Sequence, residues 1–285
     1  MHDEKRKTCK WLGSSLYGHL NLWAHSLRTI LMAIFILLMT YMLVRSFENG
    51  IILNKFEVHM GETLFSYVSS GFNMIMTSVA FLVMMSEIPK QVSYQNYTMI
   101  RLSRRKWLTS LILFCIGIVF LFTVLMLAAS ALFSISFVTP GSGWSDLERL
   151  ANNPNYVNEM QLMPKYIRSV TPFTACFLAA VILFLFWVTM AFLILLFSLC
   201  GIPNFGVVFC VSLVLLDITI LYENFPGIKL PSFFATLGSV TAQVQEHKFR
   251  FAFFVIAGYI VLDGLFIKLM DSRIRHMDIQ FTGKG

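Results

Sequence analysis

Two acidic residues interrupt apolar runs of this chain: Asp217 in "LVLLDITIL" and Asp263 in "YIVLDGLFI". An ionised carboxylate at the centre of a membrane-spanning helix costs about 2.5–3.5 kcal/mol, so each should face protein or water, or carry a proton. Such a group can contact a cationic substrate or a coupling ion, or it can form a hydrogen bond between two helices. Both interpretations stay open for both residues.

An earlier apolar run carries small and polar residues at helical spacing. They are Ser66, Ser69, Ser70, Asn73 and Thr77. Small residues let helices approach closely, and polar side chains form hydrogen bonds between helices. We therefore expect this stripe to pack against another helix, with a translocation surface as the alternative, and we group Asn73 with the two aspartates as a polar residue within the membrane.

The connection "SEIPKQVSYQNYTMIRLSRRKW" separates two long apolar runs and holds a different polar set. Pro89 ends the preceding helix, because proline lacks a backbone N–H. The segment from Tyr94 to Arg101 can form a short helix that presents Tyr94, Tyr97 and Arg101 on one face. Together with Glu87, these residues form a candidate surface for passing force between two spans. The basic residues and Trp that follow are suited to anchoring the next span at the lipid headgroups.

The composition indicates the solvent that surrounds these residues. Of the 285 residues, 57% are hydrophobic and 13% are charged, against roughly 25% charged in soluble domains. The apolar residues come in runs of about 20, a length that suits a lipid bilayer. The net charge is +7, and the cationic residues lie in the connections, so membrane orientation explains the charge and nucleic acid is not an expected partner.

Six apolar stretches are long enough to cross a hydrocarbon core of about 30 Å as helices. Helices are expected because the bilayer offers no water to the backbone, and because the alternation of barrel strands is missing. The predicted fold class is all-α, a polytopic membrane protein whose residues 29–285 form one transmembrane domain with a short cytoplasmic tail. The expected spans are 29–47, 63–85, 107–133, 173–199, 206–222 and 251–270.

The segment before the first span, residues 1–28, predicts an interfacial helix. Its apolar residues recur at spacings of 3 and 4: Leu12, Leu16, Leu20, Trp23 and Leu27. This is the pattern of an amphipathic helix lying in the plane of the interface. Of the 22 cationic residues, 14 fall on the side of the N-terminus, the second connection and the C-terminus, so we expect both termini to be cytoplasmic.

Two connections on the opposite side are expected to carry structure of their own. In residues 134–172, Ser145 stands three residues before Glu148, a capping-box pattern that predicts a short helix. The segment before the last span contains a Pro-Gly turn and Pro231, and it is too polar for a further span. We expect a re-entrant or interfacial hairpin there.

The chain lacks the patterns of several enzyme classes. It has no GxxxxGK[ST] phosphate loop, no HExxH and no GxSxG, and its five cysteines include no CxxC pair. We therefore expect no catalytic residue, no metal site and no cofactor in this chain.

The polar connection resembles that of bacterial ABC transporter permeases of the type-2, exporter-like class. "SEIPK" closes the second run and "YTMIRLSRRKWL" opens the third, similar to the acidic residue, Ile-Pro and Tyr-to-Arg-Arg-Lys-Trp pattern of permeases from Gram-positive bacteria. Six spans, an interfacial N-terminal helix and a hairpin before the last span also fit that class. One departure is that many relatives have their largest external region between the first two spans, whereas here the third connection is the longest.

The resemblance implies that the connection is a coupling helix seated in a cleft of a separate cytoplasmic ATPase subunit. ATP and Mg²⁺ would bind that partner, and a second permease subunit, identical or related, would complete an exporter in the bacterial cell membrane. The implied substrate is an amphipathic peptide, an antibiotic or a lipid. Two other hypotheses stay open: an ion-coupled secondary transporter that uses Asp217 and Asp263, and a non-transporting membrane sensor or immunity protein.

Overall fold

A computed structural model describes residues 17–54, 57–69, 71–88, 104–141, 143–145, 171–222 and 250–275 of the chain. Within these ranges the named elements are all helices, and the one β-type contact is an isolated bridge between His59 and Thr139. Residues 17–24 are helical and precede the first long helix. The long elements are α2 (Leu27–Asn54), α3 (Met60–Ser69), α4 (Gly71–Met85), α7 (Arg104–Ser134), α9 (Pro172–Leu199), α10 (Pro203–Tyr222) and α12 (Arg250–Arg275).

Four of the described helices are long and apolar enough to cross a membrane, which confirms an all-helical membrane protein. They are Leu27–Ser46, Arg104–Ser134, Pro172–Leu199 and Phe253–Arg275. Two shorter apolar helices, Ile75–Met85 and Pro203–Leu215, lie in the regions expected to form the second and fifth spans. Neither the interfacial helix as a whole nor the hairpin before α12 lies within the described residues.

The region expected to form one helix over residues 63–85 is divided into α3 and α4. Asn73 at the start of α4 donates from Nδ2 to the backbone carbonyl of Tyr67 in α3 at 2.9 Å, so a side chain bonds to a carbonyl across the break. The Tyr67 hydroxyl lies 2.6 Å from Thr40 Oγ1 of α2. Hydrogen bonds in the protein interior therefore connect α3 both to α4 and to α2.

Helix α9 forms the centre of the bundle, in contact with α3, α4, α7, α10 and α12. Trp187 of α9 stacks on Phe81 of α4, with ring centroids 5.6 Å apart, and meets the edge of Phe122 of α7 at 4.5 Å. All three rings are buried. This aromatic cluster joins three helices at the core.

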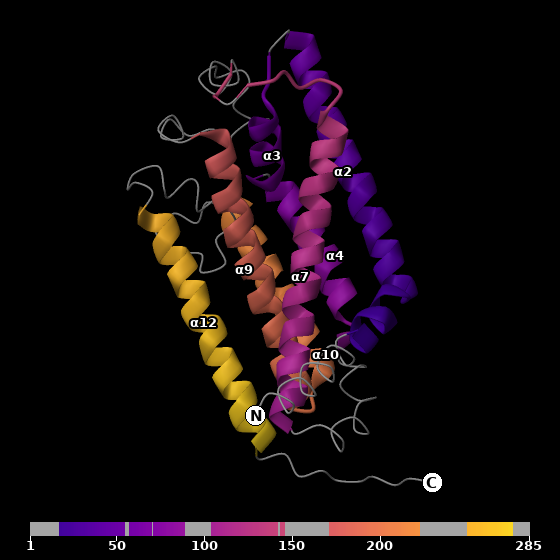
Figure 1. Ribbon diagram of the computed structural model, residues 1–285, viewed down its shortest axis with the longest axis vertical. Helices are drawn as coiled ribbons and strands as arrows, with labels where there is room; N and C mark the ends of the chain where they lie inside the picture. Colours follow the sequence, from indigo (N-terminus) through magenta and orange to yellow (C-terminus); the bar gives the residue numbers. More distant parts are fainter. Residues whose placement is uncertain are drawn as a thin grey trace, which may run out of the picture.

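Helices α2 and α12 lie on opposite flanks of the bundle (Figure 1). α2 packs on α4 and α7, and α12 packs mainly on α9. Each exposes a wide apolar face, which includes Leu38 and Met42 on α2 and Phe254 and Val261 on α12. These faces suit contact with lipid chains.

We predict that Trp187→Ala destabilises the bundle through the cavity left between α4, α7 and α9. The loss in the free energy of unfolding should lie near the lower end of the roughly 3–5 kcal/mol typical of such changes in soluble cores, because the unfolded chain stays in lipid and regains little by transfer. Reversible unfolding in bicelles measures this loss. Phe177→Ala on the same helix is the matched control, because Phe177 is 68% exposed and should change stability little; equal losses in the two variants would contradict the central role of Trp187.

Candidate functional site

The ends of four helices gather at one end of the bundle. The start of α2 lies beside the end of α4, and the start of α7 lies beside the end of α12 (Figure 1). Residues 89–103, which follow α4 and precede α7, lie outside the described residues. The connection that the sequence singles out therefore begins and ends at this gathered end.

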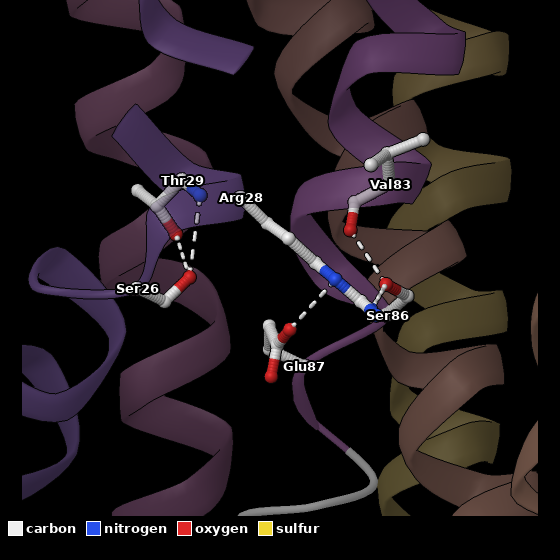
Figure 2. Close-up of polar contacts among 6 residues, drawn as sticks. All are labelled: Ser26, Arg28, Thr29, Val83, Ser86 and Glu87. Carbon is white, nitrogen blue, oxygen red and sulfur yellow. Dashed lines mark hydrogen bonds and ion pairs between the residues drawn. The ribbon is translucent and has the colours of Figure 1, made fainter. Parts of the chain in front are cut away.

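Glu87 is the one residue of the predicted contact surface that the structure describes. Its Oε1 lies 3.1 Å from Nε of Arg28 at the start of α2, and its side chain is only 15% exposed. The same guanidinium donates from Nη1 to Ser86 Oγ at 3.2 Å, and the Ser86 hydroxyl donates to the Val83 carbonyl at 2.6 Å (Figure 2). Arg28 thus binds both residues that follow α4, and so ties α2 to the point where the connection begins.

The position of Arg28 is set by the cap of its helix. The Thr29 backbone N–H donates to Ser26 Oγ at 3.2 Å, and the two hydroxyl groups lie 3.1 Å apart (Figure 2). Ser26 is therefore the N-cap of α2, and Arg28 falls in the first turn. A cation is unfavourable there because the helix dipole is positive at this end, so the Glu87 carboxylate offsets the dipole as well as the guanidinium charge.

The other residues predicted for this surface lie outside the described part of the chain. They are Pro89, Tyr94, Tyr97 and Arg101. Asp217 falls in α10, but its side chain is likewise outside the description.

The basic residues expected to anchor α7 also bind α12. Arg104 Nη1 lies 3.5 Å from the carbonyl oxygen of Ile274 and 3.3 Å from that of Arg275, so it donates to carbonyls that the end of α12 leaves unpaired. Arg105 Nε lies 3.6 Å from Asp271 Oδ1, and Arg275 pairs with the same carboxylate. The sequence predicts only headgroup contact for these residues, because α12 is more than 140 positions away along the chain.

A buried carboxylate at the opposite end of the bundle was also missed. Glu62 at the start of α3 is fully buried, and it accepts hydrogen bonds from the His59 backbone N–H at 2.8 Å and from the Ser145 hydroxyl at 2.6 Å. The Ser145 backbone N–H donates to it as well. The sequence signal was present, because an acidic residue three positions after a helix cap commonly binds the cap's N–H. Its bond to Ser145 could not be predicted in this way, because the two residues are 83 positions apart in the sequence.

Further contacts hold the same loop against the start of α3. The Thr139 backbone N–H donates to the Val58 carbonyl at 2.9 Å, and His59 Nδ1 lies 2.7 Å from the Gly143 carbonyl oxygen. Gly141 faces the His59 ring so closely that an added Cβ would lie 2.0 Å from Nε2. We call this set of contacts between residues 58–62 and 139–145 the Glu62 clasp. The helix expected after Ser145, with Glu148, lies outside the described residues.

Asp263 lies in α12 and faces the central helix. It is buried, and its Oδ1 accepts a hydrogen bond from Thr189 Oγ1 of α9 at 2.7 Å. The same hydroxyl lies 3.0 Å from the Leu185 carbonyl of its own helix, so the two acceptors share one proton. Asp263 therefore has the contact expected of a hydrogen bond between helices, and its neighbour is α9.

The polar stripe of the second run is partly inside the bundle where it is described, with Ser66 half-buried. Asn73 and Thr77 are buried, and Thr77 donates to the Asn73 carbonyl at 2.7 Å. Among the residues that the structure describes, no three His, Cys, Asp or Glu side chains could hold a metal ion. The four cysteines within those ranges are free thiols.

Comparisons with protein-family models, with curated proteins and with solved structures find no match to this chain. Its function must therefore be argued from its own residues and contacts.

We predict that Glu62→Ala loosens the Glu62 clasp. The change removes the acceptor of three hydrogen bonds and should cost at least the roughly 1.5–3 kcal/mol of one hydrogen bond to a charged group. The free energy of unfolding in bicelles measures it. Glu57→Ala is the matched control, because Glu57 is an exposed acid close by in the sequence. Equal stability of the two variants would show that the Glu62 carboxylate does not contribute to stability.

We predict that Asp263→Asn leaves the bundle as stable as the parent, because the amide oxygen can still accept from Thr189. Asp263→Leu should lose about 0.6 kcal/mol, the average for hydrogen bonds between membrane helices, and no more than about 1.7 kcal/mol. A double-mutant cycle with Thr189→Val measures the coupling directly. If Asn proves as destabilising as Leu, the carboxylate does more than accept this bond.

Proposed function

We propose that this chain is the membrane subunit of an ATP-driven exporter in the bacterial cell membrane, with both termini in the cytoplasm. In this proposal α3 and α4 together form the second span and α10 forms the fifth, which makes six. Residues 60–85 would be about 39 Å long and α10 about 30 Å, enough for a hydrocarbon core of about 30 Å. The helical residues 17–24 would be the end of an interfacial helix over residues 1–28, and a hairpin would precede α12.

The observation that carries the proposal is the ion pair between Arg28 and Glu87. It links the first helix of the bundle to the point where the 86–107 connection leaves α4. At the other end of that connection, Arg104 and Arg105 link α7 to α12. A force applied to the connection would therefore reach four helices through contacts of about 3–4 Å.

The proposed partner is a cytoplasmic ATPase subunit that binds ATP and Mg²⁺ and receives the connection in a cleft. Glu87, Pro89, Tyr94, Tyr97 and Arg101 would form the contact surface. Closure of two ATPase subunits would push on the connection, and this chain with a second permease subunit would change shape to release substrate. The proposed substrate is amphipathic: a peptide, an antibiotic or a lipid.

We predict that reversing the charge of Glu87, as in Glu87→Arg, uncouples ATP hydrolysis from transport. The pair is partly exposed, so stability should change by no more than about 1 kcal/mol. The swapped variant Arg28→Glu/Glu87→Arg should restore transport, because the pair is re-formed with opposite polarity. Transport and ATPase activity are measured together in vesicles that contain the co-purified ATPase.

The matched control is Glu48→Arg, which breaks an ion pair of similar exposure with Arg45, elsewhere on α2. It should leave coupling intact. Mass spectrometry of the gently purified complex must also show a stoichiometric ATPase subunit. A chain that purifies alone and carries a proton- or sodium-dependent flux, lost on Asp217→Asn or Asp263→Asn, would overturn the proposal in favour of a secondary transporter.

A further inference from the structure

A cationic surface lies where the start of α7 meets the end of α12. Arg105, Lys268 and Arg275 are exposed there, beside the carboxylate of Asp271. Asp271 is shared between Arg105 and Arg275, and Lys268 stands one turn earlier on α12. Among the described residues of this surface, three cations accompany one carboxylate, so its net charge is positive.

An exposed apolar strip continues from this surface along α12. Val261, Gly264 and Leu265 precede Lys268 by seven, four and three residues, so all four share one helical face. Val261 is 63% exposed and Leu265 52% exposed, and an added Cβ at Gly264 would meet nothing within 4 Å. The strip from Lys268 to Val261 covers about 10 Å of helix, well within one leaflet of a bilayer.

We infer that this surface binds an anionic phospholipid, with its phosphate at Arg105, Lys268 and Arg275 and an acyl chain along Val261, Gly264 and Leu265. Cations at the membrane surface attract anionic lipids, and basic surfaces between membrane helices bind their headgroups. The strip lies within the candidate span Phe253–Arg275, so the adjoining cations at its end stand where lipid phosphates lie. The combination of charge and apolar strip on one helix face favours the lipid.

The bound lipid would strengthen a contact that is otherwise made by few groups. Helix α12 has a mostly exposed apolar surface, and at this end it is joined to α7 through Arg104, Arg105 and Asp271. A phosphate shared by Arg105 of α7 and Arg275 of α12 would add a bridge between the same two helices. This inference does not depend on the proposed export function, because it uses only the bundle and the bilayer.

The test is a titration of the full-length chain, in neutral detergent, with phosphatidylglycerol or phosphatidylcholine, read by native mass spectrometry. Lys268→Gln/Arg275→Gln should weaken phosphatidylglycerol binding about 25-fold, since each cation near an anionic surface contributes about fivefold, or about 1 kcal/mol. Phosphatidylcholine binding should stay unchanged. The thermal stability of each variant without added lipid establishes that it is folded.

The matched control is Lys106→Gln/Arg273→Gln, which removes two cations from the same end of the bundle. Lys106 lies two residues after Arg104 on α7, and Arg273 lies two residues after Asp271 on α12. Two residues correspond to about 200° around a helix, so neither cation shares a helix face with the residue that joins α7 to α12. This control should weaken phosphatidylglycerol binding less than about threefold, well below the effect of losing two cations at the surface.

Three outcomes would overturn the inference. Equal losses in the two double variants would mean that general surface charge attracts the lipid. Displacement of the lipid by millimolar inorganic phosphate would mean that the surface binds free phosphate. Loss of a co-purifying acidic protein from Lys268→Gln/Arg275→Gln, with lipid binding unchanged, would mean that the surface binds a soluble partner.

Discussion

Lipid cannot hydrogen-bond to a polar group, and this constraint determines which polar contacts the interior of the bundle contains. The Asn73 amide bonds to the Tyr67 carbonyl at the break between α3 and α4, and the Thr189 hydroxyl bonds to Asp263 between α9 and α12. Other buried hydroxyl groups, such as those of Thr77 and Thr123, bond to carbonyls of their own helix. Two of the polar contacts in the described bundle thus join different helices or helix segments, and Trp187 adds apolar contact between three helices.

The two ends of the bundle are held by different chemistry. At one end, ion pairs of partly exposed side chains join α2 to α4 and α7 to α12. At the other end, a fully buried carboxylate collects three hydrogen bonds in the Glu62 clasp. Exposed ion pairs are weak and are screened by salt, whereas a buried carboxylate is costly to leave without its donors. The end with the ion pairs, which is the end proposed to receive force, therefore has the contacts that break more easily.

The long helices could be predicted from the sequence because length and hydropathy are local properties. The expected spans 107–133 and 173–199 correspond to α7 (Arg104–Ser134) and α9 (Pro172–Leu199). The break after Ser69 could not be predicted, since it depends on the bond from Asn73 back to Tyr67. Glu87 was recognised as a candidate from its neighbours, but Arg28, 59 positions earlier, was interpreted only as orienting charge. The role of Glu62 was missed for the same reason: its partner Ser145 is distant in the sequence.

The break between α3 and α4 is also the point where this part of the chain changes neighbours. α3 packs on α9 and α7, whereas α4 packs mainly on α2 and α10. A continuous helix would have to tilt as one rigid rod, so a movement at one membrane surface would appear at the other. α3 and α4 are instead two elements with different neighbours, and the Asn73–Tyr67 bond ties one to the other. A displacement of α3 would therefore act first on α9 and α7, and a displacement of α4 on α2 and α10.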